Sequence, residues 1–157
     1  LYKDGKIFFC HGYNINGVML QLSDDLKSVS VVWRTDVLDT HHGGYVEVNG
    51  TIYGSNWINN NQGNWCAIDW NTGAKGYETT WTGGKGKGSI IAADGMLYCY
   101  DERRGAVALV NPDPAKFDIV SEFRITKGVG PHWAHPVIVN GVLYIRHGFA
   151  LMAYKVK

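Results

Sequence analysis

The sequence predicts an all-β fold, a β-propeller segment of about three and a half four-stranded antiparallel blades that forms an incomplete ring. A short phrase occurs four times, with Asn-Gly or Asp-Gly followed one residue later by an aliphatic–aromatic pair. The glycines stand at positions 5, 50, 95 and 141, so the intervals are 45, 45 and 46 residues. Asn-Gly and Asp-Gly favour two-residue type I′ hairpins, because both central residues need positive φ. A fixed period in this range, built from strands, is typical of propeller blades.

Composition agrees with this fold and excludes several classes of function. The chain is 45% hydrophobic and 13% aromatic, with 20 glycines and only 4 prolines, which fits many short strands joined by tight turns. The net charge is +1, which argues against a nucleic-acid groove or a polybasic membrane patch. No apolar run approaches the ~18 residues of a membrane span. Cys10, Cys66 and Cys99 form no paired motif, so we expect small buried hydrophobic residues rather than a disulfide or a reactive thiol.

The first repeat covers residues 1–35 and begins with Leu1-Tyr2 as the end of an inner strand. Its further strands are expected at Lys6–His11, Val18–Leu22 and Val29–Arg34. Val29, Val31 and Trp33 alternate along the last of these. We therefore expect them to share one face of a half-buried outer strand.

The second repeat, residues 41–81, opens with two histidines and two glycines before its inner strand. Its strands are expected at Tyr45–Val48, Thr51–Ser55, Trp65–Trp70 and Gly76–Trp81. The loop Asn56–Asn64 is rich in asparagine and carries Trp57. It is long and polar enough to bind a ligand, although a simple solvated loop explains the same composition.

The third and fourth repeats cover residues 87–125 and 132–157. Their strands are expected at Ser89–Ala93, Met96–Tyr100, Ala106–Val110 and Phe117–Ile125, then at Val137–Val139, Val142–Arg146 and Ala150–Val156. The glycine-rich stretch 83–88 is no phosphate loop, because neither Gly-Lys-Ser/Thr nor a helix follows. The fourth repeat lacks an outermost strand, which closed propellers often take from the other end of the chain. We therefore expect a ring of seven or eight blades, with Lys157 close to the natural C-terminus.

One segment of the second repeat resembles a known family motif. Ala67-Ile68-Asp69-Trp70-Asn71-Thr72-Gly73-Ala74-Lys75-Gly76-Tyr77 resembles the Ala-x-Asp-x-x-Thr-Gly-Lys-x-x-Trp docking motif of PQQ-type propellers. That family includes quinoprotein alcohol dehydrogenases and non-enzymatic outer-membrane assembly lipoproteins. The resemblance implies that Asp69 and Thr72 satisfy the turn between the third and fourth strands. It also implies that Tyr77, which replaces the motif tryptophan, packs between blades, and that the chain corresponds to a C-terminal portion of such a propeller.

The resemblance also carries expectations about location and cofactor. It implies a periplasmic or secreted protein, and it admits PQQ with Ca²⁺ as a cofactor. A quinoprotein enzyme of this kind would require oxygen ligands for Ca²⁺, a catalytic aspartate and aromatic surfaces that clamp the planar quinone. Trp133 and Trp57 would offer such surfaces, and Asp101 is the one carboxylate expected near them.

Polar residues recur at two positions of the repeat. His41 and His132 both lie nine residues before a hairpin glycine, and His11 and His147 both lie six residues after one. Both positions are at the end of the blade opposite the hairpin tip, so we expect one polar rim near the mouth of the central channel. The candidate ligand-binding residues are His11, His41, His42, Asn56, Lys87, Asp101, His132, Trp133, His135 and His147. Such a rim would suit a polar ligand or a proton transfer, whereas a purely structural role for the histidines explains the same pattern.

Metal binding and nucleophilic catalysis are less favoured. A zinc site from His41, His42, His132 and His135 is opposed by the adjacency of the first two, which would point to opposite sides of an extended chain. The sequence has no nucleophile elbow. The acidic pairs Asp24-Asp25 and Asp101-Glu102 have the composition of solvated turns.

Three functions remain open at this level. The sequence favours a non-catalytic or ligand-binding propeller that uses the histidine-rich rim for recognition. The alternatives are the cofactor and substrate domain of a PQQ-dependent alcohol or sugar dehydrogenase, and a protein-interaction scaffold, which would show an exposed apolar patch. Open sheets at both ends also predict association with a second copy of the chain or with the missing half of the propeller.

Overall fold

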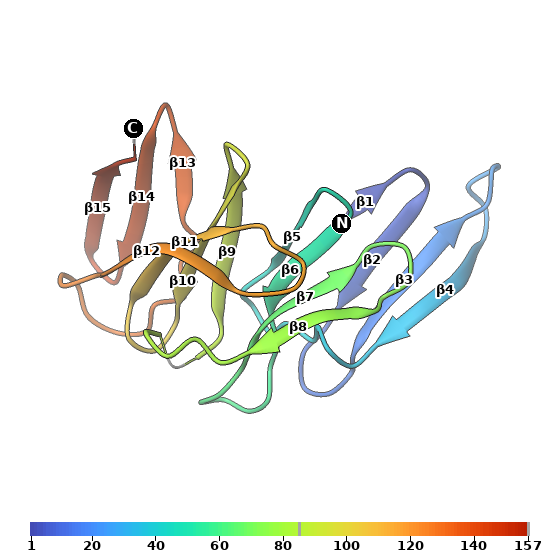
Figure 1. Ribbon diagram of the computed structural model, residues 1–157, viewed down its shortest axis with the longest axis horizontal. Coiled ribbons are helices and arrows are strands. Elements are labelled where there is room, and N and C mark those ends of the chain that lie inside the picture. Colours follow the sequence, from blue (N-terminus) through green and yellow to red (C-terminus); the bar gives the residue numbers. More distant parts are fainter. Residues whose placement is uncertain (85, 157) are drawn as a thin grey trace.

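A computed structural model describes residues 1–84 and 86–156, and these residues form four antiparallel sheets and no helix. The sheets follow one another in chain order along the long axis of the molecule (Figure 1). The predicted all-β propeller segment is therefore confirmed, as an open arrangement of blades. Within the described residues, no helix is long and apolar enough to cross a membrane.

Each sheet is a simple meander in which neighbouring strands in the sequence pair with each other. The first sheet contains β1 (Tyr2–Lys3), β2 (Lys6–Cys10), β3 (Gly17–Leu22) and β4 (Val29–Thr35), and the second contains β5 (Tyr45–Val48), β6 (Thr51–Ser55), β7 (Trp65–Asp69) and β8 (Lys75–Thr79). The third contains β9 (Gly88–Ala93), β10 (Met96–Asp101), β11 (Ala106–Asn111) and β12 (Asp118–Arg124), and the fourth contains β13 (Val137–Val139), β14 (Val142–His147) and β15 (Ala150–Lys155). The expected strands agree with these bounds to within two residues. Lys85 of the glycine-rich stretch and Lys157 at the expected end of the fourth repeat lie outside the described residues.

The four repeated phrases form the hairpin tips that their residues predict. In the second sheet, Val48 pairs with Thr51 across a two-residue turn. Asn49 and Gly50 have φ values of 51° and 82°, and the other three tips have the same positive pair. Type I′ turns require this combination, and they match the twist of the strands that they join.

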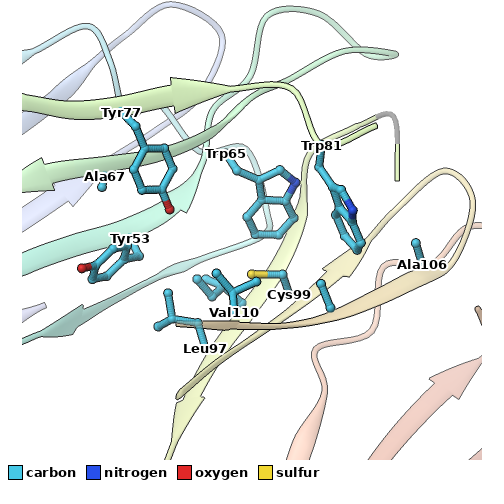
Figure 2. Close-up of a cluster of buried hydrophobic side chains, with 11 residues drawn as sticks. Tyr53, Trp65, Ala67, Tyr77, Trp81, Leu97, Cys99, Ala106 and Val110 are labelled. Atoms are coloured by element: carbon cyan, nitrogen blue, oxygen red, sulfur yellow. The ribbon is translucent and has the colours of Figure 1, made fainter. Parts of the chain in front are cut away.

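The hydrophobic core lies between the sheets, in three clusters that each join two neighbouring sheets. Figure 2 shows the cluster between the second and third sheets, where Trp65 and Trp81 lie over Cys99. The two indole rings meet edge to face with centroids 5.9 Å apart. Aromatic pairs of this geometry add to the stabilisation from burial. The sheets therefore pack face to face as propeller blades do.

The segment that resembles the docking motif is placed as the resemblance implies. Asp69 Oδ1 accepts hydrogen bonds from the Asn71 and Thr72 amides and from Thr72 Oγ1, at 2.9, 2.8 and 2.8 Å. These bonds satisfy the turn between β7 and β8. Tyr77 is buried in the cluster between the second and third sheets (Figure 2).

The outer strand of the first sheet departs from expectation. Met19 pairs with Trp33 and Leu20 with Val31, so Val32 is an extra residue at a β-bulge. A bulge reverses the alternation of side chains, so Trp33 faces inward while Val31 faces outward. The expectation of one shared half-buried face is wrong for this reason, and Val29 and Val31 are 55% and 50% exposed.

The second and third sheets approach closely at two glycines near one end of their inner strands. A Cβ on Gly43 would lie 1.9 Å from the carbonyl oxygen of Gly88, so no larger residue fits without movement of the backbone. Ser55 Oγ donates to the same carbonyl at 2.9 Å, and the Ile90 amide donates to Gly43 O at 3.2 Å. This contact places the chain entering β5 beside the chain entering β9.

The cysteines are free thiols that serve as packing residues. Cys66 and Cys99 are buried, and Cys10 is half-buried. Burial raises the pKa of Cys10 to about 11 and that of Cys99 well above its ordinary value. Thiols with raised pKa values remain protonated near neutral pH and are poor nucleophiles.

Candidate functional site

A pocket of about 310 Å³ lies at the end of the sheets opposite the hairpin tips, and we call it the rim pocket. It is built by the connection entering β5, the β6–β7 loop, the segment just before β9, the segment just after β10 and the connection entering β13. These segments belong to the second, third and fourth sheets. Its lining residues are His41, His42, Asn60, Lys87, Glu102 and Trp133. Four of these six were expected at the rim from the repeat.

A buried ion pair forms the floor of the rim pocket. Lys87 Nζ lies 2.7 Å from Glu102 Oε1, and the two side chains are only 4% and 6% exposed. Lys87 Nζ also donates to the carbonyl oxygens of Asn59 and Asn60, at 3.0 and 3.2 Å. The second carboxylate oxygen, Glu102 Oε2, lies 2.9 Å from His42 Nε2. Buried charges of this kind are tolerated only when they are paired.

Aromatic rings continue from the pocket across the rim, and we call this series the aromatic row. It consists of Trp133, His42, His41, Tyr13 and Trp57, with successive ring centroids 5.5, 5.0, 4.7 and 4.8 Å apart. Tyr13 Oη and His41 Nε2 form a hydrogen bond of 2.7 Å. Because Trp133 and Tyr13 are exposed, the row offers aromatic surface to a ligand at both the pocket and the first sheet.

The charge state of His41, one of the two pocket histidines, follows from its surroundings. Burial lowers the pKa of His41, and electrostatic repulsion from His42 and Lys87 lowers it further. His41 is therefore neutral at pH 7, and its ring both donates and accepts hydrogen bonds.

Two further predicted residues lie beside this site. His135 Nε2 donates to the carbonyl oxygen of His42 at 2.8 Å, which ties the connection entering β13 to the connection entering β5. His11 is exposed, and its ring centroid lies 6.5 Å from that of Tyr13. Both contact the aromatic row without lining the pocket.

His132 and His147 form a separate buried pair. Their rings stack with centroids 3.7 Å apart, and the Tyr100 hydroxyl bonds to His132 Nδ1. The two nitrogens of His147 face the carbonyl oxygens of Lys127 and Gly130, Nδ1 at 2.8 Å and Nε2 at 2.7 Å. Burial, and after it electrostatic repulsion from His147, lower the pKa of His132 to about 4. This pair fastens the connection between β12 and β13 and does not reach the rim pocket.

Asn56 and Asp101 do not line the rim pocket, and both side chains bond to nearby groups of the fold. The Asn56 amide nitrogen donates to Val37 O and Glu78 Oε1 at 3.0 and 2.8 Å. Asp101 Oδ2 accepts from the amides of Arg103 and Arg104, and burial raises the pKa of this carboxyl.

The interpretation of Asp101-Glu102 as a solvated turn is therefore wrong. Loops from neighbouring sheets cover it, and both side chains are buried. Asp24-Asp25, which no neighbouring sheet covers, is exposed as expected.

The orientation expected for the adjacent histidines is also wrong. The chain bends at residues 41–43 instead of running extended, so the rings of His41 and His42 lie on the same side with centroids 5.0 Å apart. His132 is buried elsewhere and cannot join them. Over residues 1–84 and 86–156, no group of three or more His, Cys, Asp or Glu side chains is arranged to hold a metal ion.

The sequence-based search missed three contributors to this surface. Glu102 supplies the buried carboxylate, Asn60 closes one wall of the pocket, and Tyr13 joins His41 to Trp57. Tyr13 lies two residues after His11, and Glu102 lies one residue after Asp101. The repeat had already singled out both His11 and Asp101. A search of the whole loop at that position of the repeat would have included them.

Comparison with known proteins supports the fold. No protein-family model and no curated protein matches the sequence. Among solved structures, the chain is similar to BamB from Moraxella catarrhalis, with a TM-score of 0.61 and 14% sequence identity. The match covers 94% of this chain and 48% of the BamB chain, so the sequence spans about half the length of that structure. At this identity the likeness shows a shared β-propeller fold, with four consecutive sheets arranged as blades.

Proposed function

We propose that this chain is a non-catalytic binding module whose rim pocket recognises a polar ligand. The observation that carries the proposal is the combination of a buried Lys87–Glu102 ion pair as the floor with the exposed ring of Trp133 in the lining. Ligand sites commonly join an apolar or aromatic surface to a few fixed polar groups. Paired charges on a rigid floor hold the surrounding rings in place and make poor acids or bases, which favours binding over catalysis.

The quinoprotein alternative fits the described residues less well. Asp101, the carboxylate expected to serve it, faces backbone amides and is buried away from the pocket. The anionic quinone PQQ would need a cation, and Lys87 Nζ already has three acceptors. The described residues of the rim pocket therefore fit PQQ with Ca²⁺ less well than a neutral ligand, and a cofactor-free module is the better proposal.

A thermal-shift screen of the 157-residue chain tests the proposed function. The panel would contain neutral, anionic and cationic polar compounds, together with PQQ in the presence of Ca²⁺. We expect at least one compound to raise the melting temperature, and Trp133→Ala to abolish that shift. Phe149→Ala is the control, because Phe149 is 83% exposed and does not line the pocket. A shift that survives Trp133→Ala, or no shift from any compound, contradicts the proposal.

A second candidate function, a protein-interaction surface, is favoured by the outward faces of the two end sheets. On the fourth sheet, Val137, Val139 and Tyr144 share the face opposite its buried one, and each is exposed. On the first sheet, Tyr2 and Phe9 lie on the corresponding outward face. Apolar sheet faces of this kind are covered by a neighbouring blade in a closed propeller. We propose that a second copy of the chain, or further blades of the same ring, cover them.

The periplasmic or secreted location stays a prediction from the family resemblance. Similarity to BamB agrees with it through the fold alone. Fractionation of cells that produce the full-length protein would test it.

A further inference from the structure

The charged groups of the rim pocket are already paired with one another. The three protons of Lys87 Nζ are taken by Glu102 Oε1 and by the carbonyl oxygens of Asn59 and Asn60. The carboxylate in turn contacts both Lys87 and His42. A phosphate or carboxylate on a ligand would have to displace a buried partner of Lys87 and leave the Glu102 charge uncompensated. Glu102 Oε2 accepts no hydrogen bond, but it is buried beside His42, so a ligand ammonium would have to displace that ring to reach it.

The surface that remains for a ligand is aromatic and neutral. The Trp133 side chain is 57% exposed and its ring stands at the mouth of the pocket. His41 is held in its neutral form, as described above. In the part of the chain that the structure describes, neither His41 Nδ1 nor the side-chain amide of the exposed Asn60 has a hydrogen-bond partner. The pocket thus offers one ring face, together with neutral groups that donate and accept hydrogen bonds.

This combination matches one class of ligand. A sugar ring presents a face of C–H groups that packs on an aromatic ring, and its hydroxyl groups each donate and accept hydrogen bonds. The volume of about 310 Å³ is at the lower end of the range for small-molecule sites. We propose that the rim pocket binds a neutral saccharide, with one sugar ring stacked on Trp133 and its hydroxyls bonded to His41 and Asn60.

The aromatic row extends the inference from one sugar to a chain. From Trp133 it continues through His42 and His41 to Tyr13 and Trp57 on the neighbouring loops. The centroids of successive rings are never more than 5.5 Å apart. Its two exposed rings, Trp133 and Tyr13, would each offer a stacking surface to a different residue of an oligosaccharide. Affinity should therefore rise with chain length. This inference rests on the proposed binding function and specifies its ligand.

Calorimetric titration of the 157-residue chain tests the inference. The probes are glucose, galactose, mannose, N-acetylglucosamine and their β- and α-linked di- to tetrasaccharides, together with glucuronate, glucosamine and glucose 6-phosphate as charged counterparts. We expect one neutral series to bind, with each charged counterpart at least tenfold weaker. Trp133→Ala should weaken binding at least tenfold and Trp133→Phe by only a few-fold, because phenylalanine keeps a ring for stacking. Phe149→Ala is the control, and circular dichroism checks that each variant is folded.

The outcomes separate this inference from the proposed function. Binding of anionic compounds alone, lost in Trp133→Ala, overturns the saccharide inference and leaves the rim pocket as a binding site. Saccharide binding that Trp133→Ala does not change overturns the inference, because it places the sugar elsewhere. Absence of binding by every neutral saccharide also overturns it, and the thermal-shift screen then decides the wider proposal independently.

Discussion

His132 shows how one buried side chain couples the fold to pH. It stacks on the ring of His147 and contacts the hydroxyl of Tyr100, so protonation would place a positive charge in a buried site against a second imidazole. Burial, and after it electrostatic repulsion from His147, lower its pKa to about 4. An unfolded histidine titrates near ~6.5. Between these two values the unfolded chain binds a proton that the native chain excludes.

The expected consequence is a loss of stability in acid. As the pH falls from 6.5 to 4, protonation favours the unfolded state, and the free energy of unfolding should fall by roughly 1 to 3 kcal/mol. Urea unfolding at several pH values measures this. His132→Gln should flatten the dependence, whereas His11→Gln, at an exposed histidine, should leave it unchanged. If the free energy of unfolding varied equally with pH in the wild type and in His132→Gln, His132 would be excluded as the cause.

At the scale of the element, Gly50 and Gly43 require glycine for two different structural reasons. Gly50 is in a hairpin turn with φ of 82°, and a Cβ added there would meet no atom within 4 Å. Gly43 lies where two sheets meet, and its added Cβ would lie 1.9 Å from Gly88 O. The first position needs glycine for the backbone conformation, and the second needs it for space.

These two positions predict different costs for the same substitution. Gly50→Ala should destabilise the chain by about 1 to 2 kcal/mol, the cost of a left-handed conformation for a residue with a Cβ. Gly43→Ala should cost about 3 kcal/mol or more, because the backbones of the second and third sheets must separate. Urea unfolding compares them. Gly43→Ala should also weaken ligand binding at the rim pocket, since the chain entering β5 carries His41 and His42. A smaller effect at Gly43 than at Gly50 would contradict the close approach of the sheets.

At the scale of the whole molecule, the series of blades has two uncovered ends. The outward face of the fourth sheet carries Val137, Val139 and Tyr144, and that of the first carries Tyr2 and Phe9. Interior blades hide the equivalent faces in the three core clusters. Large exposed apolar surfaces favour association.

We therefore expect the 157-residue chain to self-associate at micromolar concentration. Sedimentation velocity measures the fraction of dimer, and Val139→Glu should weaken the dimer at least tenfold by placing a charge on the outward face. Leu26→Glu is the control, because Leu26 is exposed in the turn between β3 and β4. A stable monomer at micromolar concentration would contradict association through these faces.

Local features of the sequence determined the strands, the hairpins and the fold class. Asn-Gly and Asp-Gly select their turn through backbone conformation, and alternation selects a strand, so neither depends on distant residues. Tertiary structure decided which polar residues meet. It joined His42 to Glu102 and Trp133, and it separated His132 from them, because the packing of neighbouring sheets sets the position of each loop. A covering loop buries Glu102, and a single bulged residue turns Trp33 inward; the local alternation of residues predicts neither.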